Sequence, residues 1–366
     1  MNLNIVNFLN FCYSSAWVTA SVFIPLIAKQ YTNNLFLISL ILVLYNSMLF
    51  FSSSIFGRLG DMYGRKKMIM WGFLISSFIL FAHNLIKNLP TIFIFRGLAG
   101  LSIGMIPGSV VALAWGNSLG WFSGFGSLGY TLGNFLPGIL KNNFLIFGSA
   151  SSFCAIGFIC SLFIKDKGKK IPVPLFPYQI IKKNLGVYLP FFIRHSAAQA
   201  IWAIFPIYLA ELGADKFQIG LLYAINPFAQ FIFMILMEKM ESEKLILTGI
   251  ICSAFTFLGY GLSPNWQIII LFQVLLGFSW ATLYLGSIKY LLKNNLEQAT
   301  ASGFLNSVIG LSGITGPLFG GIIALLGIKA LLFSSAVLSF FAFFIKRKML
   351  ENSSPLPTFP IGRHNQ

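Results

Sequence analysis

The chain has 366 residues, of which 57% are hydrophobic and only 9% are charged. Soluble domains carry about 25% charged residues, so this composition excludes an ordinary soluble protein. Apolar segments of about 20 residues recur along the chain, and each is long enough to cross a hydrocarbon core of about 30 Å as a helix. We therefore predict an all-α membrane protein that crosses the bilayer many times.

Twelve apolar segments follow one another along the chain, and each is predicted to be a transmembrane helix. They cover residues 4–28, 35–56, 68–86, 90–114, 119–140, 143–164, 186–210, 217–237, 245–262, 266–288, 299–324 and 328–346. The first segment lacks a basic leader and a small-residue cleavage site, which predicts a retained helix and not a signal peptide.

A basic, proline-bearing stretch, "KDKGKKIPVPLFPYQIIKKN", divides these segments into two sets of six. We predict an N-terminal six-helix bundle over 1–164, a cytoplasmic linker over 165–184, a C-terminal six-helix bundle over 185–346 and a tail over 347–366.

The net charge of +16 follows from where the basic residues lie. Most of them fall in loops on one predicted side of the membrane; the other side has only Lys29, Lys87, Lys141, Lys216 and Lys329. By the positive-inside rule, this bias predicts a cell-membrane protein with both termini in the cytoplasm. The basicity then sets topology and contacts anionic lipid, and no nucleic-acid partner is expected.

The cysteines show neither a disulfide pattern nor a metal-binding spacing. Cys12, Cys154, Cys160 and Cys252 all lie inside predicted spans. We interpret them as small apolar residues, and we expect no metal ion and no cofactor.

The two halves resemble each other weakly. Ungapped alignment of the fifth and eleventh segments pairs Gly120 with Gly303, Gly133 with Gly316, and Gly138 with Gly321. The fourth and tenth segments, "FRGLAG" and "FQVLLG", pair Arg96 with Gln273 and Gly100 with Gly277. Internal repeats of this kind are typical of secondary transporters, and glycines let helix backbones approach closely.

The loop after the second segment reads "GRLGDMYGRKK" over 57–67. Its glycines permit a tight turn, and its cations favour the cytoplasmic side. Asp61 is one of only nine acidic residues in the chain. A carboxylate at this junction can pair with a neighbouring Arg or with the positive N-terminal end of a helix.

This loop resembles the signature motif of the major facilitator superfamily, at the place where that family carries it. The resemblance implies two pseudo-symmetric six-helix bundles around a central cavity, with transport by rocking of one bundle against the other. It also implies that Asp61 joins the halves on the cytoplasmic side when the cavity faces outward. The residues expected to control this gating are Gly57, Asp61, Gly64, Arg65 and Lys66.

The antiporter motif of the same superfamily fits poorly. The fifth segment reads "GYTLGNFLPG", with Asn134 where that motif has Pro, and the better match, "GPLFGG", lies in the eleventh segment. A drug-efflux function is therefore not predicted from this motif.

Polar and aromatic residues at helical spacing mark a candidate substrate site. His195, Gln199 and Trp202 share one helix face in the seventh segment. The full candidate set is Arg96, Asn134, Arg194, His195, Gln199, Trp202, Asn226, Gln230, Gln273 and Trp280. Any of these amides could instead join helices by hydrogen bonds.

Charge within the spans is positive. No carboxylate lies in the middle of a predicted span, and the ionisable groups within the spans are Arg96, Arg194, His195 and, near the outer edge, His83. Ionisable groups inside a membrane usually face protein, water or a ligand. We hypothesise that Arg194 and His195 face the cavity and attract an anionic or polar solute. Arg194 could instead reach the membrane surface, Arg96 could serve packing, and His195 could be a plain hydrogen-bonded residue.

The sequence thus predicts a monomeric secondary transporter of a small polar or anionic solute, with or without a coupled ion or proton. The alternative within transport is a carrier that exports lipophilic drugs, and the alternative outside transport is a receptor built on the same fold. An enzyme is not expected, because no motif or buried carboxylate pair typical of catalysis is present.

Overall fold

The computed structural model describes residues 5–22, 24–32, 35–140, 142–166, 171–174, 176–202, 204–324 and 326–351, and all regular elements among them are helical. The first half contains α1 (Ile5–Thr19), α2 (Ile24–Lys29), α3 (Leu35–Tyr63), α4 (Arg65–Ala82), the 3-10 turn η1 (His83–Leu85), α5 (Leu89–Gly104), α6 (Pro107–Leu113), α7 (Leu119–Leu140) and α8 (Asn143–Leu162).

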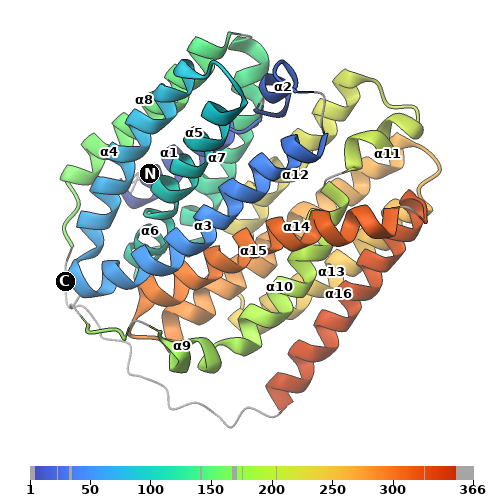
Figure 1. The fold of residues 1–366 in the computed structure, drawn as a ribbon. Coiled ribbons are helices and arrows are strands. Elements are labelled where there is room, and N and C mark those ends of the chain that lie inside the picture. Colours follow the sequence, from blue (N-terminus) through green and yellow to red (C-terminus); the bar gives the residue numbers. More distant parts are fainter. Residues whose placement is uncertain are drawn as a thin grey trace.

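The short helix α9 (Tyr178–Lys183) precedes the second half. That half contains α10 (Leu185–Trp202), α11 (Phe205–Glu211), α12 (Lys216–Leu236), α13 (Ser242–Leu262), α14 (Trp266–Asn294), α15 (Gln298–Ala324) and α16 (Ile328–Glu351). In Figure 1 the blue-to-green helices and the yellow-to-red helices form two bundles that meet along α3 and α15.

Three predicted spans are each formed by two helices. The first breaks between α1 and α2, the fourth between α5 and α6, and the seventh between α10 and α11. Pro107 begins α6, where its missing N–H removes a hydrogen bond with the preceding turn. With each broken pair taken as one pass and α9 left out, the described helices form the twelve predicted passes. Nine of the described helical segments are long and apolar enough to span a membrane unaided.

The predicted boundary after residue 56 is wrong. Helix α3 continues to Tyr63, so most of the 57–67 motif is helical and the turn is confined to Gly64. Gly64 has φ 111°, a left-handed conformation that a residue with a Cβ adopts at a cost. The extension places Asp61 in the last turn of the helix, two residues before its end, where its side chain is buried.

The two bundles are joined at one end of the molecule. One hydrophobic core contains side chains of the first half, such as Phe73 and Phe122, together with Phe191, Leu245 and Leu305 of the second half. A separate core, which includes Phe205, Tyr260 and Leu276, belongs to the second half alone. The halves touch through α3 with α15, α6 with α15, and α7 with α12.

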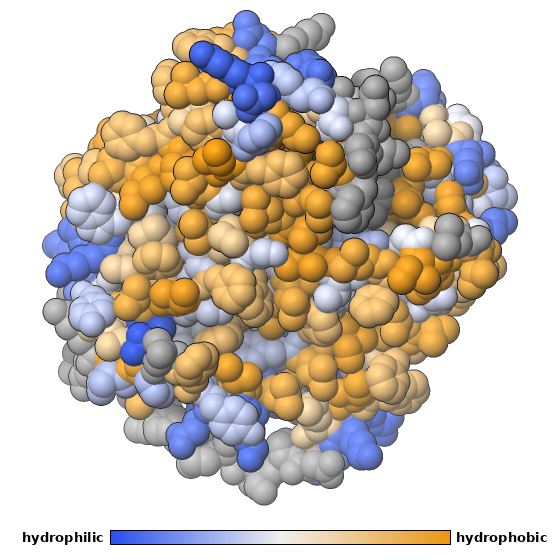
Figure 2. All heavy atoms as spheres, viewed as in Figure 1, coloured by the Kyte–Doolittle hydropathy of each residue, from blue (hydrophilic) through white to orange (hydrophobic). Residues whose placement is uncertain are grey.

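The outer surface suits a lipid environment. Large apolar side chains such as Trp71, Phe78 and Phe341 are more than half exposed. In Figure 2 hydrophobic residues cover most of the visible face, and hydrophilic ones gather mainly near its edges. A continuous apolar surface of this extent is what a bilayer covers.

The predicted topology can be tested with single cysteines in a variant that lacks the four native ones. Lys87 lies between η1 and α5 and is exposed, whereas Lys244 is exposed at the start of α13. If the positive-inside assignment holds, Lys87→Cys reacts with a membrane-impermeant maleimide on intact cells, and Lys244→Cys reacts only after permeabilisation. The reverse pattern would invert the orientation.

Candidate functional site

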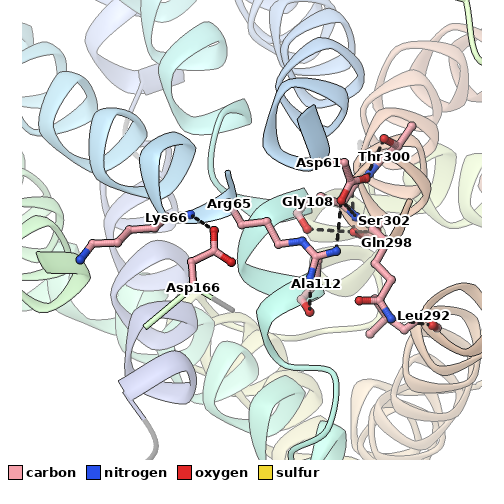
Figure 3. A network of polar contacts seen from close by, with 11 residues as sticks. Asp61, Arg65, Lys66, Gly108, Ala112, Asp166, Leu292, Gln298, Thr300 and Ser302 are labelled. Carbon is pink, nitrogen blue, oxygen red and sulfur yellow. Dashed lines mark hydrogen bonds and ion pairs between the residues drawn. The ribbon is translucent and has the colours of Figure 1, made fainter. Parts of the chain in front are cut away.

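Asp61 connects the two halves through a dense set of hydrogen bonds (Figure 3). Its Oδ1 accepts from Arg65 at 3.1 Å and from the backbone N–H of Ala299 at 3.2 Å. Its Oδ2 accepts from the backbone N–H of Thr300 at 2.7 Å and from the Thr300 hydroxyl at 2.8 Å. The residue is 2% exposed, so every favourable contact of this carboxylate comes from protein.

The position of Asp61 follows from the physics of helix ends. Helix α15 begins at Gln298, and the first N–H groups of a helix have no partner within it. These groups also carry the positive end of the helix dipole. Asp61, at the end of α3, therefore caps α15 from the other half of the chain. We call the end of the molecule where this contact lies the latch end.

Glycines let the backbones meet beside this contact. A Cβ added at Gly57 would lie 2.6 Å from the carbonyl oxygen of Ala299 and 3.1 Å from the Cα of Gly303. A Cβ at Gly108 would lie 2.7 Å from the same carbonyl. Farther along α3, the Ser54 and Ser307 hydroxyls are 2.7 Å apart. The halves are thus in backbone contact from the latch towards the middle of α3.

The segment that joins the halves also contacts the motif. The N–H of Ile171 donates to the Asp61 carbonyl at 2.9 Å, and Arg58 Nε donates to the carbonyls of Val173 and Pro174 at 2.8 Å each. Lys66 donates its N–H to Asp166 at 3.2 Å and its ammonium to the Leu162 carbonyl at 2.6 Å. The described part of the linker is therefore attached to the first half at the latch end.

A second inter-half contact was missed by the sequence reasoning. Glu238 follows the end of α12, and its carboxylate accepts a hydrogen bond from the Ser118 hydroxyl. Ser118 in turn accepts from the N–H of Trp121 in the first turn of α7 at 3.2 Å. Lys289 donates to the Glu238 carbonyl at 2.9 Å. Because the eighth and fifth spans correspond to the second and eleventh, Glu238 and Asp61 occupy equivalent positions.

The signal for Glu238 was present in the sequence, in the loop "MEKMESEK" at the position that corresponds to the 57–67 motif. That loop keeps little of the motif beyond its acidic residues. A search for a carboxylate at the end of the eighth span, and not for the motif, would have found it.

Aromatic side chains surround His195 in the second half. Its ring lies 4.8 Å from Trp280 and 5.7 Å from Phe191, between ring centroids. Trp280 also stacks on Tyr284, with centroids 5.7 Å apart and planes 11° from parallel. Gln199 lies within hydrogen-bond distance of His195 Nε2, at 3.1 Å, while Nδ1 is buried without a partner. Trp280 and Gln199 are half-buried. We call these residues the His195–Trp280 face.

Arg194 points into the second bundle. Its guanidinium donates to Ser253 at 2.5 Å and to Ser279 at 3.3 Å, and Cζ lies 5.6 Å from the Trp280 ring. The side chain is 1% exposed, and the described residues include no carboxylate paired with it. It thus places a positive charge behind the His195–Trp280 face.

The structure brings together several other predicted residues. Trp202 contacts Tyr223, with ring centroids 5.2 Å apart. Gln230 donates to Asn226 at 2.7 Å and accepts from Ser127 of the first half at 3.2 Å. The latter bond makes Gln230 part of the α7–α12 contact.

The remaining predicted residues are dispersed. Arg96 donates to Ser21 at 3.1 Å, beside the break between α1 and α2, and lies over the Tyr45 ring at 4.2 Å. Gln273 is fully buried, and neither its oxygen nor its nitrogen has a hydrogen-bond partner. Asn134 is half-buried on α7.

Comparison with known proteins identifies the family. The family model of the Major Facilitator Superfamily matches residues 6–193 and, a second time, residues 187–364. The chain belongs to the major facilitator superfamily. The two successive matches agree with the internal repeat, and the superfamily consists of multi-pass membrane transporters, which are not enzymes.

Curated relatives within the superfamily are distant. The chain is 25% identical over 307 residues to the multi-drug resistance efflux pump PmrA of Streptococcus pneumoniae, covering 74% of this chain and 75% of PmrA. It is 30% identical over 128 residues to the uncharacterized MFS-type transporter YuxJ of Bacillus subtilis, which covers 31% of this chain and 32% of YuxJ. The crystal structure of the human organic anion transporter MFSD10 superposes with a TM-score of 0.84 at 14% identity. The match covers 93% of this chain and 98% of that one, and it shows the shared superfamily fold.

Loss of either carboxylate should weaken the latch end. Hydrogen bonds to charged groups contribute about 1.5–3 kcal/mol each. Asp61→Asn and Glu238→Gln should therefore raise the fraction of molecules whose two halves are separated at the latch end about tenfold or more. The measurement is the rate at which Ser307→Cys, buried in the inter-half contact, reacts with a water-soluble thiol reagent. Glu211→Gln, at the exposed end of α11, is the control. An unchanged reaction rate in Asp61→Asn would contradict the role of Asp61 in holding the halves together.

An added methyl group at Gly57 should push the halves apart, because its nearest neighbours are backbone atoms that cannot rotate away. Overpacking of this kind costs about 1–3 kcal/mol. Spin labels at Lys67 and Lys293, both exposed, should report a longer distance in Gly57→Ala. The matched control is Gly138→Ala, where a Cβ would meet nothing within 4 Å. Equal distances in both variants would contradict close packing at Gly57.

Proposed function

We propose that this transporter carries a small polar or anionic organic solute with a planar group, which binds at the His195–Trp280 face. The observation that carries the proposal is the combination of half-buried aromatic rings with a buried arginine behind them. Flat rings provide large contact areas for planar solutes, and the arginine gives the site a positive potential.

The charge distribution supports an anionic or neutral solute over a cationic one. The chain has nine acidic residues, and all of them lie at or beyond helix ends or in the linker. A carboxylate bound on Trp280, about 9 Å from the Arg194 guanidinium, would gain about 2 kcal/mol at an effective dielectric near 20. A cation at the same place would lose a similar amount.

The arrangement of the bundles supports alternating access. Contacts between the halves are concentrated towards the latch end, whereas a Cβ at Gly138, Gly220 or Gly321, near the opposite end, would meet nothing within 4 Å. If the positive-inside orientation holds, the latch end is cytoplasmic. We infer that this conformation admits solute from the outside, and that Asp61 and Glu238 must lose their partners before the cavity can face inward.

A second candidate function is export of lipophilic drugs. It is favoured by the similarity to PmrA, a multi-drug resistance efflux pump that is 25% identical over 74% of this chain. An aromatic site suits such compounds as well. The two candidates differ in the charge that the site prefers, which makes charge the property to measure.

The charge preference can be measured with three ligands that share one ring system: naphthoate, naphthamide and naphthylmethylammonium. We expect purified protein in nanodiscs to bind the first two more tightly than the third, by about 10³-fold for the anion, because its gain and the cation's loss of about 2 kcal/mol each sum to about 4 kcal/mol. Trp280→Leu should weaken all three. Trp266→Leu, at the start of α14, is the control.

Arg194 variants separate its charge from its packing. Arg194→Gln should remove the preference for naphthoate over naphthamide, and Arg194→Lys should keep part of it because the charge remains. Tighter binding of the ammonium compound by the native protein would favour the drug-export candidate and overturn the proposed preference.

A further inference from the structure

A pocket of about 200 Å³ lies in the first half, between the end of α2, η1 and the start of α8. These segments are at the end opposite the latch, and none of them belongs to the His195–Trp280 face. A water molecule takes about 30 Å³ of liquid volume, so the pocket has room for several waters or for a small polar group. Its walls include the rings of Phe144 and Phe147.

Among the described polar residues that line the pocket, His83 is the buried one, at 1% exposed. Its Nδ1 lies 2.8 Å from the carbonyl oxygen of Ile79. A carbonyl can only accept, so Nδ1 carries the hydrogen, and in the neutral ring Nε2 presents a lone pair. Nε2 is buried and has no hydrogen-bond partner among the residues that the structure describes. The ring is held between Phe95 and Phe147, with centroids 5.8 and 5.1 Å away.

Two other lining residues also direct a donor to the backbone. Asn84 donates to the Phe81 carbonyl at 3.0 Å, and the Tyr31 hydroxyl donates to the Ile86 carbonyl at 3.4 Å. Each keeps an oxygen that can accept. Gln30 and Asn143 also line the pocket and are exposed amides that can both donate and accept. The buried lone pair of His83 can only accept, so the group that reaches it is a hydrogen-bond donor.

The charges around the pocket determine whether a cationic or a neutral hydrogen-bond donor can bind there. None of the described residues that line the pocket is acidic. Lys87 adds an exposed positive charge next to the pocket. A cationic donor such as an ammonium group is disfavoured here, whereas a neutral hydroxyl is not. An anionic phosphate next to such hydroxyls could pair with Lys87 outside the pocket.

We propose that this pocket binds the hydroxyl groups of a glycerol-type polyol, with the His83 Nε2 as the buried acceptor. The same chemistry is available from a phosphatidylglycerol headgroup and from free glycerol. This inference does not depend on the solute carried by the transporter, since the pocket and the His195–Trp280 face lie in different bundles.

The test uses the full chain in nanodiscs, with ¹⁵N-labelled histidine. In wild type, nanodiscs of phosphatidylglycerol should shift the His83 Nε2 resonance relative to phosphatidylcholine nanodiscs, because a new hydrogen bond reaches that nitrogen. His83→Phe assigns the resonance by its loss. Native mass spectrometry should show about fivefold or greater loss of retained phosphatidylglycerol in His83→Phe. Phe95→Leu, which changes the packing of the ring but does not line the pocket, should retain the lipid.

A further experiment with free glycerol identifies whether the hydroxyl groups come from the lipid or from the free molecule. A shift produced by free glycerol in phosphatidylcholine nanodiscs, without selective lipid retention, would support the polyol chemistry and assign it to the free molecule. No shift with either source, together with equal lipid retention by wild type and His83→Phe, would overturn the proposal and leave only water in the pocket. The resonance reports on wild-type protein, so the test stands even if His83→Phe folds poorly.

Discussion

The burial of one carboxylate between two halves of the chain is the constraint on which the rest of this structure depends. The side chain of Asp61 has no exposed surface to hydrate it, so its charge is balanced by Arg65 and by the first N–H groups of α15. Removing one partner of a buried charge typically costs about 3–5 kcal/mol. The halves can part only if water replaces those partners, and this requirement makes the contact reversible and dependent on conformation.

Glu238 repeats the same arrangement in the other half of the repeat, where it holds the N-terminal end of α7 through Ser118. The two carboxylates thus restrain two of the helix pairs that join the bundles, α3 with α15 and α7 with α12. A single restraint would leave the bundles free to pivot about it. Two restraints at equivalent positions define an axis, so separation at the latch end requires both to open.

Much of the architecture could be predicted from the sequence, because membrane spans are set by length and hydropathy alone. The helix count, the duplication and the superfamily follow from these and from the 57–67 motif. The breaks at Ile106 and Ile204 could not be predicted, since each depends on neighbouring helices that accept an irregular backbone. The extension of α3 through Gly57 was missed because the glycines and charged residues of this motif are typical of a loop.

The sequence indicates which residues of the candidate site share a helix face, but it does not indicate which neighbouring helices their side chains contact. Helical spacing correctly placed His195 beside Gln199, because residues four apart share a face. It could not show that Arg194 bonds to Ser253 and Ser279 on two other helices. That choice depends on how three helices pack, and small residues on α13 and α14 make the space for it.

The contact between α3 and α15 has a mechanical consequence. At Gly57 and Gly303 these two helices touch through main-chain atoms, as Gly108 of α6 does with α15, and no large side chain must withdraw at these points when the helices move. Interdigitated side chains would resist sliding and rolling, because each must leave its packed position before the helices can move. A contact made by main-chain atoms lets one bundle roll over the other once the hydrogen bonds between the halves have opened, those of the two carboxylates among them.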